Sequence, residues 1–322
     1  MKRVSREKNQ RHLFDRAVVP TVQVEIGERL VVETEDAMSG RIRSTEDLRT
    51  RERMLPMSGF EPPLGNPLAG PIYVHGVSRG DILAVHIEQI VPDLQGVTTI
   101  RPGIGALADS ERWSEIHASE YTHIIRHEPG PSGTTRDGKA VYRDGVHWDM
   151  APFVGTIGVA PEVEVETSVF GQGVWGGNWD CRDIREGSVV YLNCYNDGAL
   201  LYLGDVHGTQ GDGEWSGTAN ETRAEVTLHC TVVKNKRIPY ARIEKEHSII
   251  ALYAARPLED AVNTAITYLL EWMVEEYGLK PRDAYLRITL NPKFRINVYQ
   301  LVAMGKLQYT VGAEYPKDEL VC

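Results

Sequence analysis

The amino-acid sequence predicts a mainly β protein, with a sandwich-like or barrel-like β core and a C-terminal α+β portion. Strand-like segments, rich in β-branched and aromatic residues with period-two alternation, recur from residue 20 to residue 233. Only one segment, Leu258–Tyr277, has the apolar periodicity of a long helix. Lys234–Glu246 lies between these two patterns. We therefore expect a β-rich core over residues 1–233 and an α+β subdomain over residues 234–322.

The N-terminal part predicts two hairpins with a short helix between them. In Pro20–Asp36, apolar and polar residues alternate on both sides of a glycine turn, which is typical of a hairpin. A second hairpin is expected over residues 72–90, around the turn VSRGD. In Ser44–Leu55, Ser44 is followed three residues later by Asp47, a capping-box pattern that favours a short helix.

The middle of the chain continues as strands, with one turn of helix at Ser110–His117. Val146–Pro161 is apolar and contains two glycines and two prolines, which indicates a buried strand that closes the barrel or sandwich. We expect strands, by their β-branched and aromatic content, at Tyr121–Ile125, Ala140–Tyr142, Val146–Pro161, Ser188–Tyr195, Ala199–Leu203 and Glu225–Val233.

The C-terminal portion begins with the long helix. Its apolar stripe ends before Gly278, and Pro281 follows just beyond, so both a stop signal and the start of a second helix are present. The second helix is expected at Pro281–Leu290, followed by strands at Phe294–Val302 and Leu307–Val311.

Composition and charge exclude several classes of protein. The net charge of −10 argues against nucleic acid or an anionic membrane as the main partner, because both require a basic face. No apolar run is long enough to span a bilayer, and the charged N-terminal segment has no apolar region typical of a secretory signal. The four cysteines show no CxxC pairing. These features predict a cytoplasmic protein, and we expect it to be a homo-oligomer, a dimer.

Gly204–Glu221 is the stretch richest in side chains that could bind a metal or catalyse a reaction. It combines glycines with a histidine and acidic residues at Asp205, His207, Asp212, Glu214 and Glu221. Such dense carboxylates are costly to bury unless a cation lies among them. On an extended strand Asp205 and His207 would point to the same side and could bind one ion. A polar, glycine-rich turn explains the same pattern equally well from spacing alone. The predicted location is the loop between a strand ending at Leu203 and one starting near Arg223.

Two further aspartates and three tryptophans have alternative interpretations. Asp36 follows a predicted strand, where it is either aimed into a cleft or simply part of a turn. Asp180 lies in the glycine-containing segment Gly171–Asp183. The tryptophans Trp175, Trp179 and Trp215 either pack in the core or at its rim, or form an apolar wall that restricts substrate size.

Several stretches in order resemble the acetamidase/formamidase family of amide hydrolases. They are VVETEDA (Val31–Ala37), GNPLAGPIYVHG (Gly65–Gly76), RGD (Arg79–Asp81), PFVGTIGVAP (Pro152–Pro161), GGNWDCRD (Gly176–Asp183) and GALLYLGDVHGTQGDGEWSGTANE (Gly198–Glu221). The resemblance spans roughly residues 12–233. It implies β-structure followed by an α/β portion, a divalent metal usually taken as zinc, and site candidates at Asp36, Asp180, Asp205, His207, Asp212, Glu214 and Glu221.

The function that follows is hydrolysis of the C–N bond of a small linear amide, releasing ammonia and a carboxylate. Asp205 and His207 are the expected metal ligands, with Asp36 and Asp180 as further ligands. For the general base we expect Glu221, then Glu214; Asp212 is the third catalytic candidate. A metal-bound water supplies the nucleophile. The alternative is a non-catalytic β-rich binding protein with a structural divalent cation such as calcium.

Overall fold

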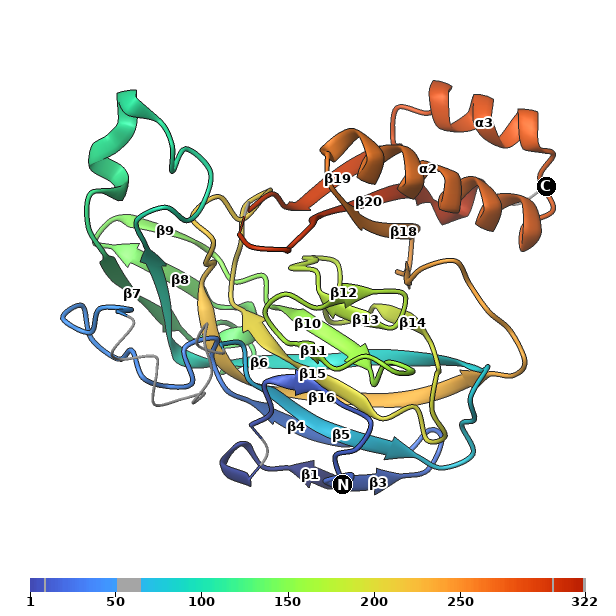
Figure 1. Cartoon of the computed structure of the whole chain (residues 1–322), viewed down its shortest axis with the longest axis horizontal. Helices are drawn as coiled ribbons and strands as arrows, with labels where there is room; N and C mark the ends of the chain where they lie inside the picture. The colour runs from blue at the N-terminus through green and yellow to red at the C-terminus, as the bar shows by residue number, and fades with distance from the viewer. Residues whose placement is uncertain (9, 51–64, 303, 321–322) are drawn as a thin grey trace.

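The computed structural model describes residues 1–8, 10–50, 65–302 and 304–320, and its architecture is mainly β (Figure 1). The two α-helices among these residues are α2 (Leu258–Glu275) and α3 (Pro281–Leu290). Short 3₁₀ helices are η1 (Arg6–Lys8), η2 (Glu111–His117), η3 (Thr135–Asp137) and η4 (Lys317–Glu319). The strands are β1 (Lys2–Val4), β2 (Leu13–Phe14), β3 (Val22–Val24), β4 (Leu30–Thr34), β5 (Leu68–Val74), β6 (Ile82–Ile100), β7 (Tyr121–Glu128), β8 (Lys139–Arg143), β9 (Val146–Asp149), β10 (Phe153–Val159), β11 (Glu166–Thr167), β12 (Gln172–Gly173), β13 (Gly176–Asn178), β14 (Val189–Asn193), β15 (Leu201–His207), β16 (Glu221–Val233), β17 (Arg242–Glu244), β18 (Ser248–Ala255), β19 (Arg295–Gln300) and β20 (Tyr309–Pro316).

The β core consists of two layers around one apolar centre, which confirms the predicted fold class. In the first layer β16 lies between β4 and β6, so that Val226 is opposite Val32 on one side and Ile90 on the other. In the second layer β15 lies between β5 and β10. Buried side chains of both layers, such as Leu228 and Leu203, belong to one hydrophobic cluster. Burial of this apolar surface is the main term that holds the layers together.

The two layers join at one corner, through the pairing of β15 with β16. In the described residues this ladder consists of Val206 opposite Thr222 and His207 opposite Glu221. The last residues of β15 are fully buried along both faces, whereas typical sandwich strands alternate. The corner therefore places polar side chains of two adjacent strands inside the protein.

The C-terminal portion is a small sheet covered by helices. β18 pairs with β20, and β20 with β19. The helix α2 packs on this sheet through buried residues such as Leu269 and Met273, in a cluster of its own (Figure 1). Both helices begin as the sequence predicts, and Gly278 follows α2 with φ +71°. The subdomain boundary at residue 233 stays a prediction.

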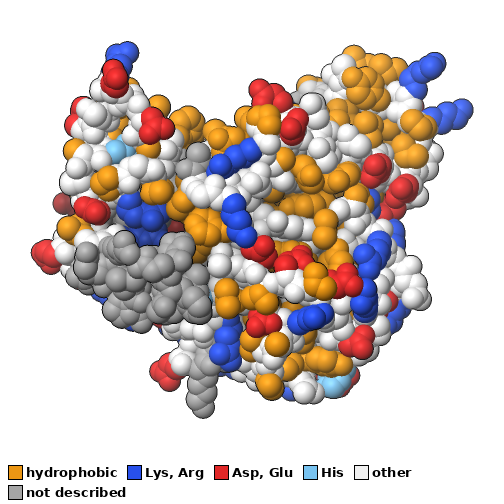
Figure 2. Space-filling view, viewed as in Figure 1, with side chains coloured by type: hydrophobic (Ala, Val, Ile, Leu, Met, Phe, Trp, Pro, Cys, Tyr) orange, Lys and Arg blue, Asp and Glu red, His pale blue; other side chains and the backbone are white. Residues whose placement is uncertain are grey.

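Two surface properties bear on partners. In the view of Figure 2, basic and acidic side chains are interspersed over the visible face. Among the described helices, none combines the length and apolarity that crossing a bilayer requires.

Both predicted hairpins are wrong in their pairing, although their strands exist. β3 pairs in parallel with β5, and β4 pairs with β1 and β16. β5 pairs with β15, and β6 with β7, β14 and β16. The turns between them are real, but the strands on either side of each turn belong to different layers. A local turn signal cannot reveal this separation, because the partners lie far away in sequence.

The helix expected at Ser44–Leu55 is also wrong where the structure describes it. Residues 45 and 46 form a turn, residues 47–50 have no regular secondary structure, and residues 51–55 lie outside the described residues. The N–H of Ser44 does donate to the Asp47 carboxylate at 3.0 Å, as in a capping box. The capping pattern is therefore present without a helix in the described part.

Candidate metal centre

The corner between the two layers brings together side chains from three segments. Asp205 and His207 lie on β15, and Glu221 is the first residue of β16. Asp180 follows β13, where its N–H donates to the carbonyl oxygen of Gly155 at 3.0 Å. The predicted loop placement is thus wrong for three of these residues, because β15 extends to His207 and β16 begins at Glu221.

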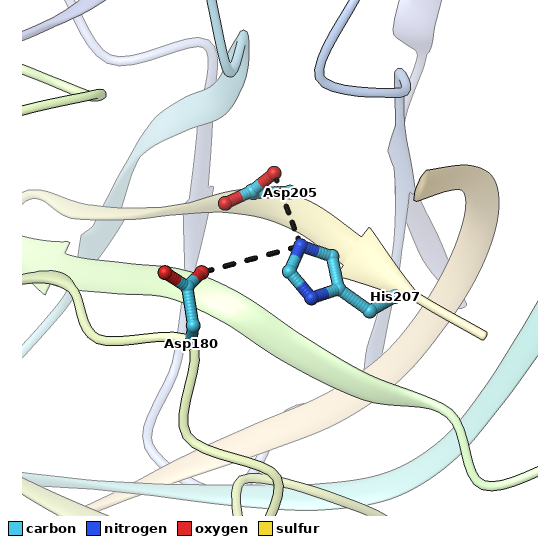
Figure 3. Close-up of side chains that lie close together, drawn as sticks. All are labelled: Asp180, Asp205 and His207. Carbon is cyan, nitrogen blue, oxygen red and sulfur yellow. Dashed lines mark ion pairs between the residues drawn. The ribbon is translucent and has the colours of Figure 1, made fainter. Parts of the chain in front are cut away.

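The side chains converge on the imidazole of His207. Its Nε2 lies 3.1 Å from Oε2 of Glu221, 3.4 Å from Oδ1 of Asp205 and 4.0 Å from Oδ1 of Asp180. Figure 3 shows one ring nitrogen of His207 directed toward the carboxylates of both aspartates. Two sets of ligand atoms lie within 4.8 Å of one another: those of Asp180, Asp205 and His207, and those of His207, Glu214 and Glu221. All five residues are buried.

In both Asp205 and Glu221, one carboxylate oxygen accepts hydrogen bonds from the protein and the other has no hydrogen-bond donor among the described residues. Oδ2 of Asp205 accepts from Nδ2 of Asn66 and from Oγ1 of Thr156, both at 2.9 Å. Oε1 of Glu221 accepts from the N–H of Ala219 at 2.8 Å. Oδ1 of Asp205 and Oε2 of Glu221 are buried and have no hydrogen-bond partner among the described residues. Buried polar atoms without partners are costly, so these oxygens point to a missing cation or donor.

Gln210 sets the tautomer of His207. Its Oε1 lies 2.8 Å from Nδ1 of His207, and its Nε2 donates to the carbonyl oxygens of Asp180 and Tyr299 at 3.0 and 2.9 Å. Because the amide nitrogen faces two carbonyls, Oε1 must be the atom that faces the ring, and Nδ1 must carry the proton. Nε2 of neutral His207 is then a lone pair aimed at the carboxylates, as in a metal-binding histidine.

The backbone at the centre is strained and tightly packed. Asp180, Asp205 and Glu214 have φ angles of +48°, +55° and +48°, in the left-handed region that non-glycine residues avoid. A Cβ at Gly155 would lie 2.7 Å from the carbonyl oxygen of Asp205 and 3.1 Å from Oδ1 of Asp180. Only glycine therefore fits at this position beside the cluster. Strain of this kind is typical of functional sites.

Burial and the neighbouring charges govern the electrostatics of the cluster. Burial, reinforced by Asp205, raises the pKa of Asp180 to about 8. Burial also raises the pKa of Glu214 well above its usual range, and Asp180 adds to the shift. Burial lowers the pKa of His207, but Glu221 and Asp205 outweigh it and raise that pKa well above its usual value. A cation bound here would relieve this competition for protons.

A cavity of about 30 Å³ adjoins the cluster, which is room for water-sized groups. Two arginines line it besides Asp180, Asp205, Glu214 and Glu221. Burial, with the neighbouring Arg49, lowers the pKa of Arg101 to about 9. Burial lowers the pKa of Arg49 too, although Glu221 and Asp205 oppose the shift. The predicted site did not include these arginines, nor Asn66 and Thr156, since none lies in the glycine-rich stretch.

Two of the predicted site residues are not brought into either set of ligand atoms. Oδ1 of Asp36 accepts from the N–H groups of Met38 and Gly40, both at 2.9 Å, in a turn of the kind weighed above. Its other oxygen is 3.5 Å from Arg43. Asp212 is exposed and pairs with Arg182 at the surface. The structure thus brings the other five predicted residues together and leaves these two aspartates outside the cluster.

Two of the cysteines and the three tryptophans can also be located. Cys181 and Cys194 are buried, and burial raises the pKa of both thiols, which disfavours the reactive thiolate. Trp175 and Trp179 are buried in the core, as their packing interpretation predicts. Trp215, in contrast, is 56% exposed. Of the three, Trp215 alone is placed to meet a ligand.

Together, the two-layer β fold and the buried histidine–carboxylate cluster define a class: a β-rich protein with a candidate divalent-metal centre. The family model described as the Acetamidase/Formamidase family matches residues 2–172 and 169–259. The chain belongs to this family.

Relatives of known name or structure agree with this assignment. An acetamidase from Bacillus halodurans has 29% sequence identity and a TM-score of 0.85, with 98% of each chain covered. An acetamidase from Yersinia enterocolitica also has 29% identity and a TM-score of 0.86, covering 100% of this chain and 93% of that one. A Schizosaccharomyces pombe protein with a provisional formamidase name is 26% identical over 213 residues, 52% of each sequence. The chain thus spans about half the length of that curated relative.

Proposed function

We propose that the protein hydrolyses the C–N bond of a small linear amide, releasing ammonia and a carboxylate, with a divalent ion held at the corner of the β layers. The observation that carries this proposal is the convergence of Nε2 of His207, Oδ1 of Asp205 and Oε2 of Glu221, all buried and without hydrogen-bond partners. The family membership and the two acetamidase structures support the reaction class.

The donor set fits zinc. Two ligand atoms on a tetrahedral zinc ion, each about 2.0–2.1 Å from the metal, are about 3.3 Å apart. The separations of 3.1 and 3.4 Å from Nε2 of His207 agree with this value. Calcium binds six to eight oxygens and does not favour an imidazole nitrogen. Oδ1 of Asp180 lies farther from Nε2 of His207, at 4.0 Å, so three protein ligands would leave the fourth position of a tetrahedral ion to water.

The charges balance around one divalent ion. If all are ionised, Asp180, Asp205, Glu214 and Glu221 carry four negative charges, and the two arginines that line the cavity carry two positive ones. One divalent cation therefore neutralises the centre, which is required for a buried charge cluster. When bound, such an ion lowers the pKa of a water and polarises a carbonyl group.

Other residues of the site would position the ligands, transfer the proton and stabilise the developing negative charge. Asn66, Thr156 and Gln210 fix the ligands in place. Glu221 lies at a ligand distance from His207, so we assign proton transfer from water to the departing amine to Glu214, which faces the same cavity. This exchanges the order of the two glutamates that the sequence favoured. Arg49 and Arg101 offset negative charge that develops on the acyl oxygen.

Metal analysis combined with an ammonia-release assay on formamide and acetamide tests the proposal. We expect about one zinc per chain, loss of activity on chelation, and loss of metal from a folded His207→Ala variant. Fully metal-free protein that hydrolyses amides at the native rate would contradict the mechanism. A tightly bound ion without amide turnover would favour the non-catalytic binding protein with a structural cation.

A further inference from the structure

The loop between β15 and β16, residues 208–220, separates the small cavity from a larger one. The larger cavity, called the outer pocket here, has a volume of about 520 Å³. Its lining includes Ile125, Tyr142, Trp148, Asp212, Glu214 and Trp215. Pockets that bind organic ligands have volumes of about 300–1,000 Å³. An amide of four heavy atoms would leave most of the outer pocket empty.

Two tryptophans in fixed positions face this pocket. The indole N–H of Trp148 donates to Oγ1 of Thr209 at 3.0 Å, and Tyr142 stacks on Trp148 with ring centroids 5.9 Å apart. Trp215 is exposed although its loop is held on both sides. The N–H of Ala106 donates to the carbonyl oxygen of Trp215 at 2.7 Å, and Gly213 exchanges two backbone hydrogen bonds with residues 298 and 301. These backbone hydrogen bonds therefore hold the loop in a position that leaves the indole of Trp215 exposed.

The outer pocket adjoins the centre, because Glu214 and Thr218 line both cavities. Glu214 belongs to one of the two sets of candidate ligand atoms. A molecule that fills the outer pocket thus contacts Glu214, the residue assigned to proton transfer. Gln210, which holds His207, lines the same pocket.

The charges of the residues that line the outer pocket determine which chemical groups it can bind. Among the residues that the structure describes, the lining includes Asp212 and Glu214 but neither lysine nor arginine. An anionic group would lie beside these two acidic residues with no basic side chain in the described lining to offset them, whereas an uncharged ring would contact Trp148, Trp215 and Ile125.

We propose that the outer pocket binds an uncharged aromatic group on the acyl side of the substrate, so that the protein acts on primary arylalkyl amides in preference to acetamide. The inference rests on the proposed function, since the reacting amide must reach Glu214. In the reaction the C–N bond breaks and water supplies the new C–O bond. The nitrogen, with its two hydrogens and both protons of the water, leaves as ammonium beside an arylalkyl carboxylate.

The test compares phenylacetamide with acetamide by kcat/KM. We expect the wild type to favour phenylacetamide, and Trp215→Ala to lower the ratio of the two kcat/KM values about tenfold, a usual effect of lost contacts in an apolar pocket. Trp148→Ala provides a second variant if the first does not fold. Trp113→Ala, another half-exposed tryptophan that does not line the pocket, is the control and should leave the ratio unchanged.

Calorimetric binding of benzyl methyl ketone, in which a methyl group replaces the amide nitrogen, separates this inference from the proposed function. Binding that Trp215→Ala weakens, with no amide hydrolysed, would support the pocket and reject the hydrolase. Acetamide turnover without ketone binding would do the reverse. Equal losses of kcat/KM for both amides in Trp215→Ala would also overturn the inference, because they would indicate damage to the loop rather than loss of a contact with the ring.

Discussion

Replacing Gln210 by leucine should weaken metal binding without removing a ligand. Leucine keeps a similar volume but cannot accept the proton of Nδ1 of His207, which Gln210 accepts at 2.8 Å. The ring then loses the contact that fixes its tautomer and orientation. Loss of such a supporting partner typically costs 10–100-fold in metal affinity, or about 1.4–2.7 kcal/mol. The carbonyls of Asp180 and Tyr299 also lose a donor, so the effect should lie toward the upper end.

The assay is competition for zinc with a chelator of known affinity, together with thermal unfolding of the metal-free proteins. Gln172→Leu is the matched control, because Gln172 also donates to several acceptors between the β core and the C-terminal strands but does not touch His207. Both variants should lose stability, and only Gln210→Leu should lose zinc affinity. Unchanged affinity in folded Gln210→Leu would refute the assigned tautomer and the metal centre built on it.

Three further predictions concern other parts of the structure. Glu214→Gln should keep zinc and lose about 10²–10⁴-fold in turnover, as expected of a general base, whereas Glu221→Gln should lower zinc content as well; metal analysis and kcat distinguish them. Gly155→Ala should destabilise the protein by about 1–3 kcal/mol in urea unfolding, since the added Cβ meets a carbonyl oxygen of β15 at 2.7 Å. Asp183→Asn should lower stability at pH 7, because burial raises the pKa of Asp183 but Lys245 holds it below its usual value of 3.8. That stabilisation is present above about pH 4 and fades as the pH falls, so the difference from wild type should shrink in acid.

Contrary results have distinct meanings for these variants. Zinc loss in Glu214→Gln with retention in Glu221→Gln would restore the order of the glutamates expected from the sequence. Full stability of Gly155→Ala would show that β10 can move away from β15. A constant stability difference between Asp183→Asn and the wild type from pH 7 to pH 3 would mean that Asp183 contributes by its shape rather than its charge.

Much of the fold follows from the sequence because its signals are local. The long helix has both an apolar stripe and a glycine stop, and the structure places it over Leu258–Glu275. The strands of the core are equally visible in their composition. Strand pairing was not predictable in the same way, since β3 and β4 are close in sequence but belong to different layers. Pairing depends on which buried faces meet, and a single sequence does not record this.

The site was predictable to the extent that its residues lie in one motif. Asp205, His207, Glu214 and Glu221 were identified from the density of acidic groups among glycines, and Asp180 from the resemblance. Their placement on strands was missed because glycine and aspartate are the usual signals of a turn. Supporting residues such as Asn66 and Thr156 carry no signal of their own, as they reach Asp205 from positions 139 and 49 residues away.

These long separations also determine when the centre forms during folding. Closing loops of such length costs entropy, so contacts between distant strands form late and slow the folding of β-rich proteins. Before the two layers meet at the corner, the chain offers a metal only Asp205 and His207 as close neighbours. Glu221 arrives when β16 pairs with β15. An ion bound at this centre would therefore be acquired by a nearly complete protein, after the metal-free chain has reached its native topology through the burial of its apolar layers.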